Sequence, residues 1–190
     1  MADQSEVAQS LVTLIAGAVY PNGTGQASIT GAPIRVQAGW PIASDLEPWL
    51  ASGGVHVSVY EMPGDKITSV MMADGEWVPT GTTTIGQEIR RQAKTFKIGV
   101  WASTPAMRDA VASPVDVALA VTSRMTFSDT SQGVMTYVNS TQLDDQQRAG
   151  IYRRDLNYSV NYATTQTQTA VAITGIVANI VNGTTATPIT

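Results

Sequence analysis

The chain of 190 residues is long enough to bury a sizeable core in one domain. Hydrophobic residues make up 43% of it, charged residues only 14%, and the net charge is −4. This composition excludes a disordered polymer. It also excludes a helical membrane protein, because even the longest apolar run, 170–181, is interrupted by Thr174, Gly175 and Asn179.

The absence of cysteine excludes disulfides, thiolate zinc sites and thiol nucleophiles. Asp3 and Glu6 stand where a signal peptide would carry positive charge, so no export signal is expected. With so few charges, the surface must consist largely of Thr, Ser, Gln and Asn. Such a surface favours a protein that packs against copies or partners, and the alternative is a Thr-rich soluble β protein.

The first segment predicts a helix. Asp3 can cap it, and Glu6 follows at capping-box spacing. The residues 21–23 (Pro-Asn-Gly) end it. Its apolar stripe consists of Val7, Leu11, Leu14, Ile15 and Ala18.

The segment 23–39 is rich in Gly, Ala and Thr and predicts an extended arm with a possible short strand at 34–37. A second helix of about two turns is expected after it, with Ser44 and Glu47 as a capping box. Trp49 and Leu50 would face the core.

From Val55 the pattern changes to strands. Residues 55–60 alternate apolar and polar side chains, and Pro63-Gly64-Asp65 is expected to end that strand. A small hairpin is expected from 67–72 and 76–78 around Asp74-Gly75. Two further strands, 83–91 and 94–102, predict a meander.

Thr104 and Pro105 open a helix with proline at its first position. Helical spacing continues through Arg124. Ser113-Pro114 interrupts it, so either a kink or two short helices is expected.

The last third predicts strands at 134–139 and 152–162, the second with one buried and one wet face. In 164–169 Thr and Gln alternate, so neither face is apolar and the register is weakly specified. The predicted fold class is α+β, a mainly antiparallel sheet flanked by two or three helices. It forms a single domain, 1–190, with extended arms at 23–39 and 164–190 that would reach neighbouring subunits.

Residues that could perform chemistry are few. His56 is the only histidine, and no neighbouring motif supplies a nucleophile or an orienting acid. Asp144-Asp145 is a weak metal signal without further oxygen ligands at loop spacing. No phosphate-binding loop or nucleophile elbow is present in the sequence. We therefore expect no catalytic, cofactor or metal site and no enzymatic activity.

Basic and tryptophan residues are the candidates for interfaces. Six of the eleven basic residues lie in two strand regions. They could form a nucleic-acid face, or they could lie on solvated strands and in inter-subunit salt bridges. The net negative charge of the chain favours the second interpretation. The tryptophans lie at predicted element boundaries, where exposed ones would anchor subunit contacts. The candidate interface residues are Trp40, Trp49, Trp77, Trp101, Arg90, Arg91, Arg153 and Arg154, with Lys94 and Lys97 completing the basic set.

The stretch 41–50 (PIASDLEPWL), running into 54–60 (GVHVSVY), resembles the tail-terminator and tail-completion proteins of tailed bacteriophages. The run 96–101 (FKIGVW), which leads into the helix around Arg108 and Asp109, is similar to them as well. The arm 23–39 and the Thr/Gln segment are more elaborate than a minimal terminator needs.

The resemblance implies a structural virion protein that is assembled in the host cytoplasm. It implies a ring, usually of six copies, at the head-proximal end of a phage tail, which stops tube polymerisation and joins the tail to the neck. Its partners would be tail tube and neck or connector proteins. DNA would at most pass through the lumen, and no membrane would be contacted.

Three alternatives stay open. The first is another neck, collar or minor tail protein. The second is a carbohydrate- or protein-binding module, which would expose Trp40 and Trp77 in a groove. The third is an uncharacterised hydrolase, which would need a pocket with convergent titratable groups around His56 or Asp155.

Overall fold

The computed structural model describes residues 3–70, 78–79, 84–143, 150–169, 181–182 and 185–186, with side chains described for 3–68, 88–142 and 150–165. The fold is α+β, as predicted. Its elements in chain order are α1 (Gln4–Val19), β1 (Ile34–Ala38), α2 (Ala43–Ala51), β2 (Val55–Val70), β3 (Val78–Pro79), β4 (Thr84–Ala102), α3 (Pro105–Val121), β5 (Arg124–Thr126), β6 (Gln132–Leu143), β7 (Tyr152–Thr169), β8 (Val181–Asn182) and β9 (Thr185–Ala186).

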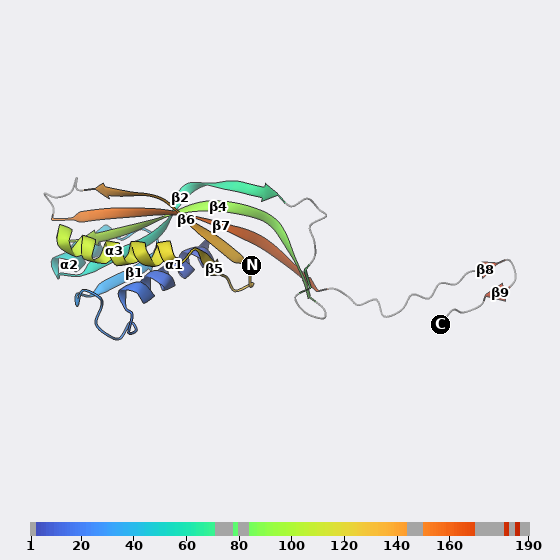
Figure 1. Ribbon diagram of the computed structural model, residues 1–190, viewed down its shortest axis with the longest axis horizontal. Coiled ribbons are helices and arrows are strands. Elements are labelled where there is room, and N and C mark those ends of the chain that lie inside the picture. The colour runs from blue at the N-terminus through green and yellow to red at the C-terminus, as the bar shows by residue number, and fades with distance from the viewer. Residues whose placement is uncertain are drawn as a thin grey trace.

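One curved sheet carries the fold, in the order β1-β2-β4-β7-β6-β5. Only β1 and β2 are parallel, and every other neighbouring pair along this order is antiparallel. The short strand β3 pairs with the first part of β4. The helices lie along one part of the sheet, while β2, β4 and β7 run on past them (Figure 1).

The helix α1 begins as expected, because the Asp3 carboxylate accepts a hydrogen bond from the Glu6 N–H at 2.8 Å. This bond is the first cause of the lowered pKa of Asp3. The prediction that Glu6 completes the capping box is wrong. Glu6 Oε1 accepts from the Ser128 N–H at 2.6 Å and so ties the start of α1 to the β5–β6 turn.

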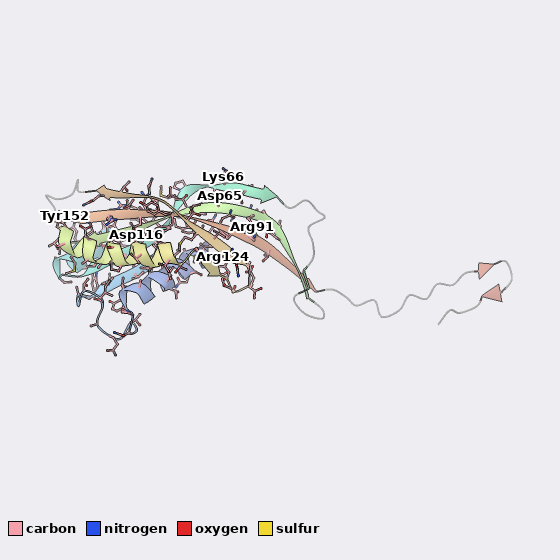
Figure 2. The ribbon with its side chains drawn as sticks, viewed as in Figure 1. Asp65, Lys66, Arg91, Asp116, Arg124 and Tyr152 are labelled. Atoms are coloured by element: carbon pink, nitrogen blue, oxygen red, sulfur yellow. The ribbon has the colours of Figure 1, made fainter. Side chains whose placement is uncertain are left out.

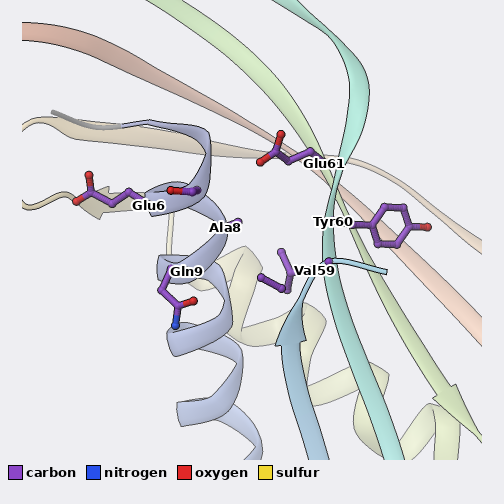
Figure 3. Close-up of a pocket in the computed structure, with 9 residues that line it drawn as sticks. Glu6, Ala8, Gln9, Val59, Tyr60 and Glu61 are labelled. Atoms are coloured by element: carbon purple, nitrogen blue, oxygen red, sulfur yellow. The ribbon is translucent and has the colours of Figure 1, made fainter. Parts of the chain in front are cut away.

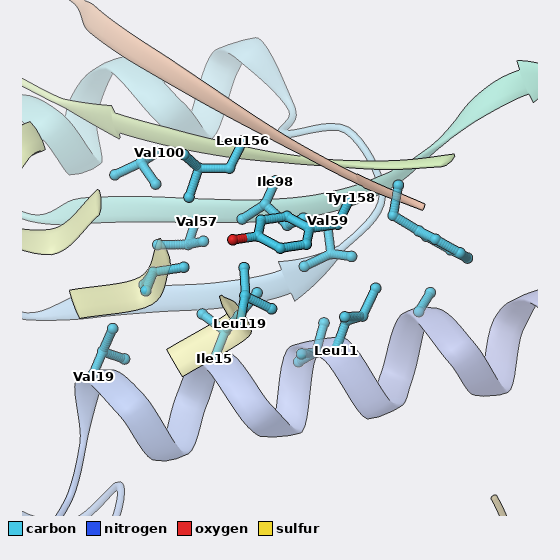
Figure 4. Close-up of a cluster of buried hydrophobic side chains, with 14 of the residues drawn as sticks. Leu11, Ile15, Val19, Val57, Val59, Ile98, Val100, Leu119, Leu156 and Tyr158 are labelled. Carbon is cyan, nitrogen blue, oxygen red and sulfur yellow. The ribbon is translucent and has the colours of Figure 1, made fainter. Parts of the chain in front are cut away.

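The core lies between one face of the sheet, here called the inner face, and the helices α1 and α3 (Figure 4). Strand alternation puts every second side chain of β2, β4 and β7 on this face. The predicted apolar side of 152–162 is confirmed, since its residues from Leu156 to Tyr162 are fully buried there. The sheet side of the core consists of Val55, Val57, Val59, Phe96, Ile98, Val100, Leu156, Tyr158, Val160 and Tyr162.

The strands are longer and less interrupted than expected. Residues 83–91 and 94–102 belong to the single strand β4, because the Gln92-Ala93 dipeptide offers no turn chemistry and pairs without a break with β7. Pro63-Gly64-Asp65 does not end β2 but forms a bulge in its pairing with β4.

Ile67–Val70 and β3 both pair with β4, so the described pairing does not contain the expected hairpin; its turn, Asp74-Gly75, lies outside the described residues. The segment 164–169, expected to open the C-terminal arm, continues β7 beside β4. The strands β8 and β9 pair with each other.

The other two helices also differ from expectation in their ends. α3 is one helix with Pro114 inside it, and it ends at Val121, so Arg124 opens β5 instead. α2 begins after Ile42 without a side-chain cap; Ser44 Oγ bonds Asp45 within the helix instead of capping it. Leu50 is buried, as predicted.

Within 23–39, the expected short strand is confirmed as β1. The preceding loop is held by the Ile29 N–H, which donates to the Val19 carbonyl at 3.0 Å. That this segment reaches a neighbouring subunit stays a prediction. Among the described residues, no helix is both long enough and apolar enough to span a bilayer.

Candidate interaction surface

The sheet face opposite α1 and α3, here called the outer face, carries a cluster of aromatic and charged side chains. β2 contributes Ser58 and Tyr60, β4 contributes Lys97 and Trp101, and β7 contributes Arg153 and Asp155, all at positions that alternate with core residues. Trp40, just after β1, completes this set, which we call the outer-face cluster.

Asp155 is the buried centre of the cluster. Its side chain is 0% exposed, although the alternating pattern placed it on a wet face. The Arg153 Nε donates to Asp155 Oδ1 at 2.6 Å, and Lys97 Nζ lies 3.6 Å from Oδ2. Gly99, paired with Asp155 across the sheet, leaves the space that this carboxylate occupies.

The Arg153 guanidinium is held on several sides at once. Its Nη2 donates to the Tyr60 hydroxyl at 2.6 Å. It lies 4.3 Å from the ring centre of Trp101 and 4.8 Å from that of Trp40. Stacking of this kind adds to the ion pair, so the arginine is fixed in one orientation.

Trp40 makes the cluster accessible from outside. Its ring meets Tyr60 edge-on at 4.7 Å and Trp101 edge-on at 5.8 Å, yet it is 56% exposed, whereas Trp101 is buried. Burial, followed by the Asp155 charge, raises the pKa of Tyr60 to about 12, so its hydroxyl stays neutral. A half-exposed aromatic side chain on a rigid base is the usual form of an interface anchor.

The structure thus brings together three of the eight candidate interface residues, Trp40, Trp101 and Arg153. Trp49 lies apart on α2, where its Nε1 donates to the Val55 carbonyl at 2.9 Å and the Arg35 guanidinium lies 4.1 Å from its ring centre. Trp77 lies outside the described residues.

The basic residues do not form one surface. Arg90, Lys94 and Arg154 alternate onto the inner face, whereas Arg91, Lys97 and Arg153 occupy the outer face. Figure 2 places Arg91 on the part of β4 that runs past the helices, where its Nη2 lies 2.8 Å from Glu88 Oε2. Arg154 donates to Ser140 Oγ at 3.2 Å.

His56 lies buried under α2 on the outer face. It is 3% exposed, and its Nε2 has no hydrogen-bond partner within the described structure. Burial, and then the nearby Arg35 charge, lowers its pKa to about 4. His56 lines a small hollow of about 40 Å³, which is also lined by Arg35 and Asp45. No described neighbour bonds Nε2 of this neutral imidazole, so this nitrogen lacks the orienting partner that a general base uses.

A larger hollow of 590 Å³ lies between the first turns of α1 and the β1–β2 edge. Val59 and Glu61 face it, whereas Tyr60 points to the other side of the sheet (Figure 3). Within the described part of the chain, no three His, Cys, Asp or Glu side chains are placed to hold a metal ion.

No family model and no curated protein matches this sequence. The fold, by contrast, is shared with the sheath/tube terminator of an extracellular contractile injection system, PVC, in its extended state. The two chains are 15% identical and align with a TM-score of 0.54 over 96% of this chain and 64% of the terminator chain. The chain thus spans about 64% of that terminator's length.

A chain from the virion of a native gene transfer agent particle also aligns, over 84% of this chain and 96% of that chain, at 15% identity and a TM-score of 0.45. The alignment with the sheath/tube terminator alone confirms the structural resemblance expected from the sequence.

Proposed function

We propose that this protein is a tail-terminator-like structural component of a phage-like or contractile injection particle, without enzymatic activity. The observation that carries the proposal is the fold shared with a sheath/tube terminator over 96% of the chain. The low charge of the sequence, the ion-paired state of Asp155 and the buried, neutral state of His56 support a structural role over a catalytic one.

In this role the chain forms a closed ring, of six copies by the resemblance, at the head-proximal end of a tail. The ring stops tube polymerisation and joins the tail to the neck, so its partners are tube and neck proteins. DNA at most passes through the lumen. The protein is assembled in the host cytoplasm and stays in the particle.

The outer-face cluster is the part of the surface that we assign to partner contacts. Trp40 supplies exposed aromatic area, and its ring packs against the Arg153 guanidinium, which Asp155 holds in place. Such preorganisation reduces the entropy lost when a contact forms.

Native mass spectrometry and electron microscopy of the purified chain, with and without tail tubes, test the proposal. A closed ring that caps tube ends is expected. The variant Trp40→Ala should weaken tube or neighbour binding at least about tenfold, while Val121→Ala, which removes a 78% exposed side chain on α3, should leave it unchanged. A stable monomer at micromolar concentration, with or without tubes, contradicts the proposal.

The exposure of Trp40 also favours a second candidate, a carbohydrate- or protein-binding module that acts as a monomer. Calorimetric titration with a panel of oligosaccharides separates the two. Binding by the monomer that is lost in Trp40→Ala would favour the module.

A further inference from the structure

The β6 strand has an open edge. β5 pairs only with its first residues, from Gln132 to Val134, which leaves the edge from Tyr137 to Leu143 without a neighbour in the described chain. No residue of β6 is charged and none is proline. Tyr137 and Val138 are about half exposed. Soluble proteins normally block such an edge with charge or proline, so this one is suited to accept another strand.

The orientation of the backbone decides which groups of β6 are free. The Met135 N–H donates to the Ser123 carbonyl, so Met135 turns its amide groups away from β7. Met135 pairs with Val160, and the residues at the equivalent alternate positions beyond the bulge are Ser140 and Gln142. In an antiparallel ladder such residues direct both N–H and C=O outward. Ser140 and Gln142 therefore present their backbone groups at the open edge.

The opposite edge of the sheet is β1, and no strand of the described residues pairs with its outer side. The Val55 N–H donates to the Pro33 carbonyl, and the Gly39 N–H donates to the Val59 carbonyl, so the odd-numbered residues face β2. The even-numbered residues turn outward. The backbone N–H and carbonyl of Ile34 are both bonded to the Tyr20 hydroxyl, each at 2.8 Å. Val36 and Ala38 are left facing outward.

These two sets of free groups lie on the same rows across the sheet. The pairing registers connect them strand by strand. One row is Ala38, Val59, Ile98, Leu156 and Ser140; the next is Val36, Val57, Val100, Arg154 and Gln142.

We propose that β1 of one copy pairs with the open half of β6 of the next copy, with Val36 opposite Gln142 and Ala38 opposite Ser140. This inference rests on the ring of the proposed function and deepens it. A rotation about an axis along the strands keeps strand directions, and β1 and β6 run in opposite directions, so the new pair is antiparallel. Four backbone hydrogen bonds then form between groups that already face outward.

The side chains agree with this register. All four residues point to the inner face, so the covered side of one sheet continues into that of the next. On the outer face Gln37 meets Thr141, and no like charges oppose each other. Because the two edges of one copy differ but fit each other, the contact is heterologous and can close a ring.

A designed disulfide tests the register. Gln37 and Thr141 form a pair without hydrogen bonds between them, so their Cα atoms are expected at about 4.5 Å, within reach of a disulfide. The chain has no cysteine of its own. Mild oxidation of the double variant Gln37→Cys/Thr141→Cys should therefore give a reducible ladder of covalent multimers on a denaturing gel.

The matched control is Gln37→Cys/Thr136→Cys, which keeps both thiols on the outer face but moves one about 13 Å along β6. It should cross-link at least about tenfold less. A second test is Ser140→Pro, which removes an outward N–H and leaves the bonds to β7. It should convert rings to monomers that melt at the same temperature as the dissociated parent chain, whereas Ser140→Ala, which also loses the contact with Arg154, should keep the ring.

The outcomes separate the two proposals. A ring in which both cysteine pairs cross-link equally, and which survives Ser140→Pro, overturns the edge pairing and leaves the proposed function standing. A chain that stays monomeric at every concentration overturns both. A ladder specific to Gln37 and Thr141 supports both.

Discussion

The two faces of the sheet are stabilised in different ways. The inner face is covered by α1 and α3 and packs apolar side chains such as Ile98 and Leu156. The outer face, over the same strands, instead buries Asp155 between Arg153 and Lys97. Apolar packing is non-directional and contributes most of the folding free energy, whereas a buried ion pair contributes geometry more than net stability. The comparison teaches that the inner face supplies most of the folding free energy, whereas the outer face fixes the geometry of an exposed surface.

The largest expected effect tests the inner face. Ile98→Ala removes a fully buried side chain from the core and should lower the free energy of unfolding by about 3–4 kcal/mol. Urea denaturation of Ile98→Ala and of the parent chain measures this loss. Ile67→Ala, at a 52% exposed position of β2, is the control and should cost no more than about 0.5 kcal/mol. Equal losses at the two sites would contradict the assigned core.

The second prediction concerns the centre of the outer-face cluster. Asp155→Ala leaves the Arg153 and Lys97 charges without their carboxylate and should cost about 3 kcal/mol. Glu88→Ala, which breaks the more exposed pair with Arg91, should cost at most about 1 kcal/mol. If Asp155→Ala costs no more than Glu88→Ala in the same urea titration, the outer face is not held by this charge.

The third prediction follows from His56 and has a defined sign. Its pKa is lowered from 6.5 to about 4 in the folded chain, so between these values the unfolded chain binds the proton and the folded chain does not. Stability should therefore fall by about 2 kcal/mol from pH 7 to pH 5. The variant His56→Leu should lose this dependence in denaturation curves at the two pH values; an unchanged slope would contradict it.

The smallest expected changes in stability are those of two glycine-to-alanine variants. A Cβ at Gly99 would lie 3.0 Å from Ser58 Oγ and 3.3 Å from Asp155 Oδ1, so Gly99→Ala should cost about 1–2 kcal/mol. At Gly17, inside α1, a Cβ meets nothing within 4 Å, and Gly17→Ala should stabilise by about 0.5–1 kcal/mol. Opposite shifts of the melting temperature are expected, and two shifts of the same sign would contradict the tight outer face.

The parts of the fold that follow from local pattern were predictable. The cap at Asp3 and the alternation along 152–162 depend on residues next to one another in the chain. The continuity of β4 is different. The sequence pattern predicts two strands there although no residue between them favours a turn, and the turn signal at 63–65 forms a bulge because β4 offers a partner on both sides of it.

The outer-face cluster was only partly predictable. Trp40, Trp101 and Arg153 were candidates as single residues, yet the sequence did not show that they meet. Asp155 was assigned to a wet face because a period of two separates faces but does not report what covers them. Gly99 was the available signal, since a glycine inside a strand often marks a close approach by a neighbour.

The position of β7 has a consequence for how the molecule is made. It follows β4 and β6 in the chain, yet it lies between them in the sheet. During synthesis at roughly 5–20 residues per second, β4 therefore waits several seconds before the strand that completes its core leaves the ribosome. Chains interrupted before Tyr152 cannot close this sheet. Only chains translated past that strand acquire the two edges that we propose to join, so incomplete copies are excluded from assembly by topology alone.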